Sequence, residues 1–261
     1  MEIVFPVLIL TVIAIVFGIA IAYCSKKFAV KEDPRIESVN DLLAGANCGA
    51  CGKAGCADFA KAVVEGTAKL GDCSVTSKEN KEKILAVLGG EGVVDEETIV
   101  VCACNGGNAC ADKYSYQGYG DCASVELLAG GRKACPVGCM GMGTCVNACA
   151  YHAVEIRDGV AYVNQQNCIQ CGACIRNCPK KLMKRIPKDA TYYVACSNTD
   201  RGKDVRAVCK NGCIGCGLCA KACPVGAIKM VNNLPQFDYN LCTACGLCAE
   251  KCPAKVILKV R

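Results

Sequence analysis

Two closely spaced cysteine runs near the C-terminus decide the fold of this chain. The first reads Cys213-Ile-Gly-Cys216-Gly-Leu-Cys219-Ala-Lys-Ala-Cys223-Pro224, and the second reads Cys242-Thr-Ala-Cys245-Gly-Leu-Cys248-Ala-Glu-Lys-Cys252-Pro253. Both follow the pattern C-x2-C-x2-C-x3-C-P. The first three cysteines of each run wrap one loop around a common centre, and glycine lets the backbone turn close to the sulfur atoms. The fourth cysteine opens a helix, and the proline after it ends the loop.

This spacing is the one that holds [4Fe–4S] clusters in bacterial two-cluster ferredoxins, where the fourth cysteine of each run ligates the other cluster. The predicted ligation is therefore crossed. One set is Cys213, Cys216, Cys219 and Cys252, and the other is Cys242, Cys245, Cys248 and Cys223. Two complete copies of the pattern predict two [4Fe–4S] clusters.

The cysteine content of the whole chain supports metal binding. With 27 cysteines among 261 residues, it exceeds the level of about 8–10% that marks a metal or disulfide scaffold. Disulfides need an oxidising compartment, and they do not explain repeated C-x2-C-x2-C runs. Structural zinc prefers two C-x2-C pairs separated by about a dozen or more residues. Because the chain has no Trp and only 5 Phe, metal binding is expected to supply much of the folding free energy.

A second module of the same kind precedes the first. Its intact run is Cys168-Ile-Gln-Cys171-Gly-Ala-Cys174-Ile-Arg-Asn-Cys178-Pro179, and the run before it is Cys135-Pro-Val-Gly-Cys139-Met-Gly-Met-Gly-Thr-Cys145-Val-Asn-Ala-Cys149. Met142 stands where a ligand is due, and a thioether is a poor iron ligand beside thiolates. We therefore expect Cys135 to supply the missing thiolate. The predicted sets are Cys135, Cys139, Cys145 and Cys178, and Cys168, Cys171, Cys174 and Cys149. Between them, Asp158-Gly159 predicts the turn of a β-hairpin.

Two more groups of four cysteines lie upstream. The pattern C-x2-C-x4-C-x16-C of Cys48, Cys51, Cys56 and Cys73 supplies four thiolates for a further cluster. The pattern C-x-C-x5-C-x11-C of Cys102, Cys104, Cys110 and Cys122 matches no known ligand spacing, so these residues are either an extra cluster site or packing cysteines and free thiols. Five clusters are expected, with a sixth left open. Cys24, Cys196 and Cys209 have no assigned partners.

The N-terminal segment predicts a membrane anchor. Residues 3–23 are uncharged and almost wholly apolar, and about 20 such residues are enough for a helix to span a bilayer. A cleaved signal peptide would need a basic n-region, but only Glu2 precedes the apolar run. Lys26 and Lys27 follow it, so the positive-inside rule places the N-terminus outside the cell and the soluble modules in the cytoplasm.

Charge is divided unevenly along the chain. Residues 1–159 carry a balance of −5 and residues 160–261 a balance of +11, which together give the net charge of +6. The aromatic platforms of a single-strand nucleic-acid binder are missing, so no nucleic-acid partner is expected. Each cubane with four thiolates adds about −2 and offsets most of the excess. The remaining positive charge, including the run over residues 180–188, is either a solvated face or a surface that steers an acidic partner such as soluble ferredoxin.

The whole arrangement resembles the B subunit of the Rnf complex. A single membrane helix, the loop Gly45-Ala-Asn-Cys48-Gly-Ala-Cys51-Gly and a series of ferredoxin modules carry the resemblance, which covers essentially the entire chain. The helix with this loop is its most specific part, since ferredoxin modules alone are common. Met142 and Ala150 depart from the motif, and the C-terminal module is additional.

The resemblance implies an ion-translocating ferredoxin:NAD+ oxidoreductase in a prokaryotic cell (inner) membrane. In that family the B subunit takes electrons from reduced ferredoxin and passes them toward flavin- and iron–sulfur-bearing partner subunits, while Na+ or H+ is driven outward. This chain has no Gly-x-Gly-x-x-Gly after a strand, no P-loop and no nucleophile–base constellation. It is therefore expected to be an enzyme only as a subunit of the complex, with no catalytic residues and no NAD site of its own.

The predicted fold class is α+β. The expected domains are a transmembrane helix (1–25), a linker (26–38), a four-Cys [4Fe–4S] domain (39–85), a connecting segment with cysteines (86–130), ferredoxin module 1 (131–188) and ferredoxin module 2 (189–261). Three other functions fit the same motifs: a wire that reduces a redox-sensing transcription factor, a subunit of another membrane reductase, and a store of metal. Ordered reduction potentials would exclude storage, and the partner proteins separate the first two.

Overall fold

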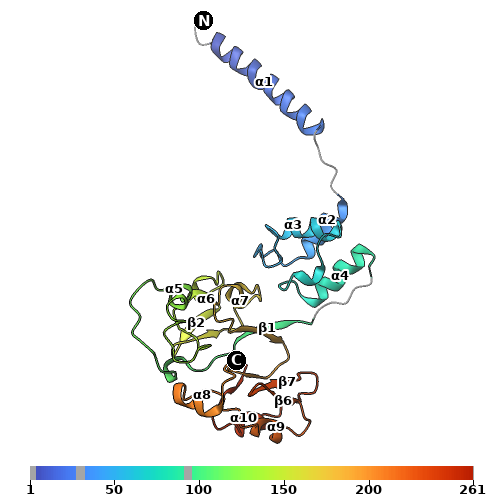
Figure 1. The fold of residues 1–261 in the computed structure, drawn as a ribbon. Coiled ribbons are helices and arrows are strands. Elements are labelled where there is room, and N and C mark those ends of the chain that lie inside the picture. The colour runs from blue at the N-terminus through green and yellow to red at the C-terminus, as the bar shows by residue number, and fades with distance from the viewer. Residues whose placement is uncertain (1–3, 28–32, 91–95, 261) are drawn as a thin grey trace.

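The computed structural model describes residues 4–27, 33–90 and 96–260 of the chain. The first element is the helix α1 (Val4–Lys27), which lies outside the packed remainder of the molecule (Figure 1). Its large apolar side chains are exposed, with 64% of Phe17 and 66% of Ile19 accessible. The predicted span over residues 3–23 begins outside the described residues, and within the described part of the chain no helix is long and apolar enough to cross a membrane.

A small helical unit follows. It consists of α2 (Pro34–Leu42), α3 (Cys56–Val64), the 3-10 turn η1 (Leu70–Asp72) and α4 (Lys78–Leu88). Its core contains Val39, Phe59 and Ile84, which are essentially inaccessible. Three short helices can form a stable unit here because each buries an apolar face against the other two.

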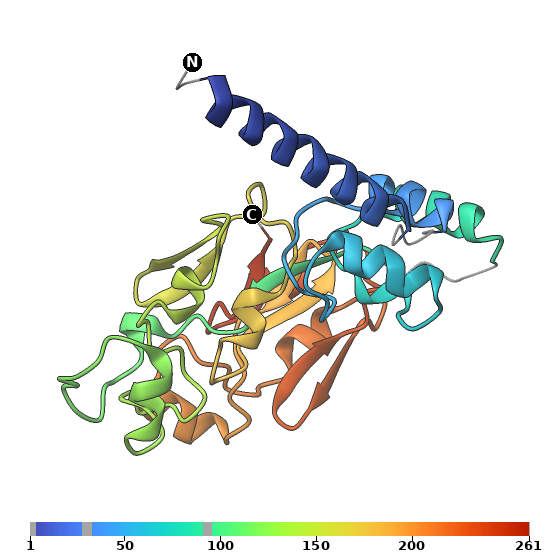
Figure 2. The same ribbon diagram turned by 90° about the horizontal axis from the view of Figure 1, so that it is seen from above.

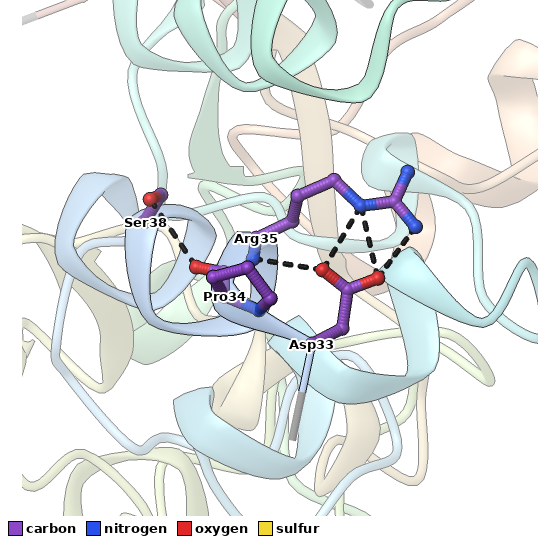
Figure 3. A network of polar contacts seen from close by, with 4 residues as sticks. All are labelled: Asp33, Pro34, Arg35 and Ser38. Atoms are coloured by element: carbon purple, nitrogen blue, oxygen red, sulfur yellow. Dashed lines mark hydrogen bonds and ion pairs between the residues drawn. The ribbon is translucent and has the colours of Figure 1, made fainter. Parts of the chain in front are cut away.

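The start of α2 is fixed by a local polar network (Figure 3). The Asp33 carboxylate accepts a hydrogen bond from the backbone N–H of Arg35 at 2.9 Å and pairs with the Arg35 guanidinium at 2.6 Å. Pro34 occupies the first turn, where its missing N–H costs nothing. The hydrogen bonds from Arg35 hold the pKa of the Asp33 carboxyl below its usual value.

Residues 96–260 contain four two-stranded antiparallel sheets. They pair β1 (Thr98–Cys102) with β4 (Met183–Pro187), β2 (Val154–Arg157) with β3 (Val160–Val163), β5 (Tyr192–Val194) with β8 (Ile257–Lys259), and β6 (Ile228–Val231) with β7 (Leu234–Phe237). The intervening helices are η2 (Gly107–Ala109), α5 (Cys122–Leu127), α6 (Thr144–Asn147), α7 (Ala173–Arg176), α8 (Gly202–Val208), α9 (Leu218–Ala222) and α10 (Leu247–Glu250). An α+β mixture is thus confirmed.

The hairpin predicted at Asp158-Gly159 is confirmed. Arg157 pairs with Val160, and both turn residues have positive φ, 48° at Asp158 and 75° at Gly159. This is the backbone conformation that a two-residue hairpin turn needs. The corresponding turn of the C-terminal module, Asn232-Asn233, has the same conformation, with φ of 48° and 62°.

Two longer-range pairings were not predicted. Strand β1 lies beside β4, with Cys102 opposite Met183, so the segment before module 1 supplies an outer strand to that module (Figure 2). Strand β5 pairs in the same way with β8 and closes the C-terminal module. An isolated antiparallel β-bridge, formed by the backbones of Cys110 and Cys209, then links the segment after β1 to the start of the C-terminal module.

Cysteine side chains make up much of the core. The central cluster of the C-terminal module contains Cys213, Cys219 and Cys248 beside Ile228, Val256 and Ile257. Two-stranded sheets are marginally stable on their own in water. We therefore attribute much of the stability of residues 96–260 to what the cysteines bind.

Candidate functional site

The first cavity of the C-terminal module is lined by all four cysteines of one predicted set. They are Cys213, Cys216, Cys219 and Cys252. Gly217, with φ of 70°, caps the N-terminus of α9, and this turn brings Cys216 and Cys219 to the same cavity. Met230, Pro235 and Val256 form apolar walls around the sulfur atoms. Four thiols facing one apolar cavity match what a [4Fe–4S] cluster requires.

The second cavity of this module contains the other crossed set. It is lined by Cys223, Cys242, Cys245 and Cys248, with the rings of Tyr192 and Phe237 beside them. Each helix thus delivers its last cysteine to the cavity formed by the other run. Burial raises the pKa of the Cys248 thiol to about 11. Iron must therefore displace protons from these thiols when it binds, since the thiolate is the metal ligand.

In module 1 the structure also brings the intact set together. Burial raises the pKa of Cys174 to about 11, and the neighbouring thiols of Cys168, Cys171 and Cys149 contribute to the rise. The Cys149 Sγ accepts a hydrogen bond from the backbone N–H of Ala153 at 3.3 Å. Such N–H···S contacts stabilise a thiolate without removing it from the cavity.

The remaining cavity of module 1 differs from the prediction. Cys139, Cys145 and Cys178 line it as expected, but Cys135 is absent from its walls and Cys122 is present. The backbone N–H of Cys122 donates to the Thr144 hydroxyl at 2.7 Å, which fixes the start of α5 next to the loop that carries Met142. The structure thus places Cys135 outside this cavity, and the two further thiols in its walls are those of Cys102 and Cys122. We propose Cys122 as the fourth ligand, because its segment is held next to the loop of Met142.

The predicted set of Cys102, Cys104, Cys110 and Cys122 is divided by the structure. Cys102 and Cys122 line the cavity of module 1, whereas Cys104 and Cys110 line a different cavity together with Cys135. Cys102 lies at the end of β1, in the wall of the module 1 cavity, and contacts Cys139. These cysteines are neighbours in sequence but belong to two separate sites.

The N-terminal four-cysteine set is centred on the small helical unit. Cys51, Cys56 and Cys73 pack against the core that contains Val39 and Phe59. The backbone N–H of Cys56 donates to the Asn47 side chain at 2.8 Å, and the Cys73 thiol lies 3.2 Å from the Thr76 hydroxyl. Cys48 is half-buried in the loop that leads to this core.

No group of three or more His, Cys, Asp or Glu side chains in the described parts of the chain is arranged to hold a single metal ion. The cysteines line cavities instead, and a cubane places its own iron and sulfide atoms between the thiolates. The donor set is thus soft sulfur throughout, which suits iron–sulfur clusters.

The regrouping of Cys122 and Cys135 gives a testable prediction. Cys122→Ser is expected to lower the iron content by about four atoms per chain. The double variant Cys122→Ser, Cys139→Ser is expected to lose the same amount and no more, because both thiols serve one cluster. Iron analysis of anaerobically purified protein measures this. Cys102→Ser is the matched control, since it changes a buried thiol at the same cavity and should keep the iron. Loss of iron from the control but not from Cys122→Ser would contradict the assignment.

Comparisons with known proteins find iron–sulfur families over three parts of the chain. A family described as "Putative Fe-S cluster" matches residues 43–75, and two described as "4Fe-4S dicluster domain" match residues 161–230 and 212–256. The first match covers Cys48 to Cys73 and the last covers Cys213 to Cys252. Together they support multiple [4Fe–4S] clusters in this chain.

Curated relatives extend over most of the sequence. The B subunit of the Na(+)-translocating ferredoxin:NAD(+) oxidoreductase complex of Acetobacterium woodii is 38% identical over 90% of this chain and 71% of the relative. The B subunit of the ion-translocating oxidoreductase complex of Methanosarcina acetivorans is 40% identical, covering 85% and 84%. The B subunit of the proton-translocating ferredoxin:NAD(+) oxidoreductase complex of Clostridium ljungdahlii is 36% identical, covering 89% and 83%. The chain therefore belongs to the family of B subunits of ion-translocating oxidoreductase (Rnf) complexes.

Proposed function

We propose that this chain carries single electrons from reduced ferredoxin toward NAD+ inside a membrane complex that moves Na+ or H+. The observation that carries the proposal is the succession of cysteine-lined cavities along one chain of this family. When bound, the [4Fe–4S] clusters supply one-electron redox chemistry at low potential. The protein supplies the thiolates, the N–H donors to sulfur and the apolar walls that fix each site. The NAD site belongs to a partner protein of the complex.

The C-terminal module is the proposed point at which electrons are received. Among the described residues, the exposed cysteines are Cys216, Cys245 and the α1 residue Cys24. Cys216 and Cys245 are ligands of the two C-terminal sites in this proposal. Leu218 and Leu247, each next to one of these loops, are exposed by 45% and 39%. An accessible cluster edge with apolar neighbours suits the brief docking of a small redox protein.

Exposed lysines surround the same loops. Lys221 on α9 and Lys251 just after α10 are both exposed. The basic run over residues 180–188 is less suitable, because Lys180 donates to the carbonyl oxygens of Gly130 and Pro136 at 2.8 and 2.6 Å. That side chain is occupied within the fold, so we assign ferredoxin steering to the C-terminal module.

Charge reversal tests both the docking surface and the function. Lys221→Glu combined with Lys251→Glu is expected to slow reduction of the chain by reduced ferredoxin by about 10-fold at low salt, with less effect at high salt. Stopped-flow bleaching of the thiolate-to-iron absorption measures the rate. Lys61→Glu, an exposed α3 residue of the N-terminal unit, is the matched control. Equal reduction rates for the two variants would contradict the proposed docking site. If reduced ferredoxin did not bleach the wild-type chain, the proposed function would be contradicted.

The N-terminal unit is the proposed exit toward the membrane. The Ser74 hydroxyl donates to the Gln170 carbonyl at 3.0 Å, and the Arg185 guanidinium donates to the same carbonyl at 2.8 Å and to Ser74 at 3.1 Å. Ser74 follows Cys73, and Gln170 precedes Cys171. These bonds tie the four-cysteine unit to the loop of a module 1 site. The proposed order is therefore C-terminal module, module 1, N-terminal unit.

Membrane anchoring by α1, with the modules on the cytoplasmic side, completes the proposal. It is supported by the uncharged stretch over residues 3–23, by the exposed apolar side chains of α1, and by Lys26 and Lys27 in its last turn. Deletion of residues 1–27 is expected to move most of the protein from the membrane pellet to the supernatant after washing. Retention in the pellet after partner subunits have also been removed would contradict the anchor.

A further inference from the structure

A fourth cysteine-lined cavity lies between the two ferredoxin modules, outside all the sites described above. It is lined by Cys104, Cys110, Cys135, Cys196 and Cys209. None of these residues belongs to a C-x2-C-x2-C run, and neither Cys196 nor Cys209 is in a ligand set assigned to either module. The cavity therefore requires an explanation of its own.

Three of these thiols are buried together and come from three separate segments. Cys110, Cys135 and Cys209 form one buried cluster, with 4%, 7% and 7% of each residue accessible. The backbone N–H of Ala111 donates to the Val208 carbonyl at 2.9 Å, and that of Ala134 donates to the Ala111 carbonyl at 2.8 Å. These bonds bring the three segments side by side and aim their cysteines at one point.

Cys104 completes a set of four. A Cβ atom placed on Gly106 would lie 3.7 Å from the Sγ of Cys104, 3.2 Å from the Sγ of Cys209 and 3.3 Å from the Cβ of Cys110. All three cysteines are therefore close to Gly106. The Cys104 Sγ also accepts from the N–H groups of Gly106 and Cys139, each at 3.4 Å. The Cys135 Sγ accepts from the Asn198 amide at 3.4 Å. N–H···S contacts of this kind favour thiolates.

The loop that carries Cys104 and Cys110 is held rigidly. The buried ammonium of Lys133 donates to the carbonyls of Gly107 and Cys110 at 2.9 and 3.2 Å and pairs with Asp112 at 3.1 Å. A Cβ at Gly107 would overlap the Asp158 carbonyl oxygen. A preorganised loop lowers the entropy cost of gathering ligands from distant segments.

The size of the cavity favours a cluster over one ion. Its volume is about 20 Å³, against about 10 Å³ for each of the two C-terminal cavities, which are both lined by a complete ferredoxin-type ligand set. A zinc ion with thiolates at about 2.3 Å would draw four sulfur atoms into a much smaller volume. Packing alone is a poor account, since five of the residues that line this cavity are cysteines, against the two valines Val137 and Val205.

We propose that Cys104, Cys110, Cys135 and Cys209 hold a sixth [4Fe–4S] cluster that bridges the two ferredoxin modules. Cys135 lies four residues before Cys139 of module 1, and Cys209 lies four residues before Cys213 of the C-terminal module. Cys104 accepts from the N–H of Cys139, and Cys196 accepts from the N–H of Cys213, both at 3.4 Å. The site thus touches a ligand loop of each module. Its role as a relay rests on the proposed function, but the ligand set does not.

Paired substitutions test the grouping of ligands by iron content alone. The wild type is expected to hold about 24 iron atoms per chain, and about 20 would mean that the sixth site is empty. Cys110→Ser combined with Cys209→Ser should lose about four iron atoms, because both thiols serve one cluster. Cys110→Ser combined with Cys122→Ser should lose about eight, because they serve two. A loss of only four from the second pair would overturn the grouping.

Two further measurements guard against misfolding and misassignment. Cys196→Ser, a change at the same cavity, is the matched control and should keep all the iron; loss of four atoms there but not in Cys104→Ser would overturn the assignment of Cys104. Metal analysis and Mössbauer spectroscopy of the wild-type chain need no variant. One zinc per chain beside about 20 iron atoms would overturn the cluster. Normal ferredoxin-dependent bleaching in that case would show that the proposed function survives without it.

Discussion

Removal of iron from the anaerobically purified chain is expected to unfold residues 96–260. Their sheets are two-stranded, and cysteines make up a large share of the buried residues in both module cores. Structural metal sites contribute folding free energy of order 10 kcal/mol, which exceeds the whole stability of many small domains. Loss of the clusters should therefore abolish the strand signal in far-UV circular dichroism together with cooperative thermal unfolding.

The helical unit of residues 33–90 provides the internal comparison. Its core of Val39, Phe59 and Ile84 is apolar, so part of its helical signal should survive iron removal. Hydrogen exchange followed by peptide mass spectrometry would resolve the two regions. Protection of β2, β3, β6 and β7 in the iron-free chain would contradict the expectation, because it would mean that protein contacts alone hold these modules together.

Replacement of one buried ligand is expected to stop electron flow through the whole subunit. Cys219→Ser changes a thiol that is only 7% accessible and lines the first C-terminal cavity. Because the sites act in series, loss of one removes every path through it, and ferredoxin-dependent NAD+ reduction by the complex should fall to background. The decisive readout is the rate in the assembled, anaerobically purified complex.

The matched control for this experiment is Cys102→Ser. Cys102 is equally buried, at 5% accessible, but is not assigned as a ligand. The control should retain most of the activity, which separates loss of a cluster from loss of packing. A Cys219→Ser complex that keeps its rate would show that electrons bypass the C-terminal module.

Local sequence patterns predicted the parts of this molecule that depend on neighbouring residues. The spacing from Cys213 to Pro253 anticipates both C-terminal cavities with their crossed cysteine sets, because short loops and single helical turns bring those thiols together. Asp158-Gly159 likewise anticipates its hairpin, since two consecutive residues of positive φ form that turn.

The regrouped cysteines depend on contacts between distant segments, which local spacing does not encode. Cys122 reaches its cavity through a hydrogen bond to Thr144, 22 positions away. Cys135 lies beside Cys110 and Cys209, whose segments pair with each other, and not beside Cys139 as predicted. The pairing of β1 with β4 joins residues more than 80 positions apart. In the sequence, only Met142, which departs from the ferredoxin pattern, indicated that a further thiol had to complete the site of Cys139, Cys145 and Cys178.

Omission and restoration of this chain in the purified membrane complex test the central claim most directly. The quantity to measure is NAD+ reduction by reduced ferredoxin under anaerobic conditions. We predict that a complex lacking the chain is inactive, that the iron-loaded wild-type chain restores the rate, and that the iron-free chain does not. An unchanged rate without the chain, or a restored iron-rich complex that reduces some other acceptor but not NAD+, would contradict its role as the electron carrier between ferredoxin and NAD+.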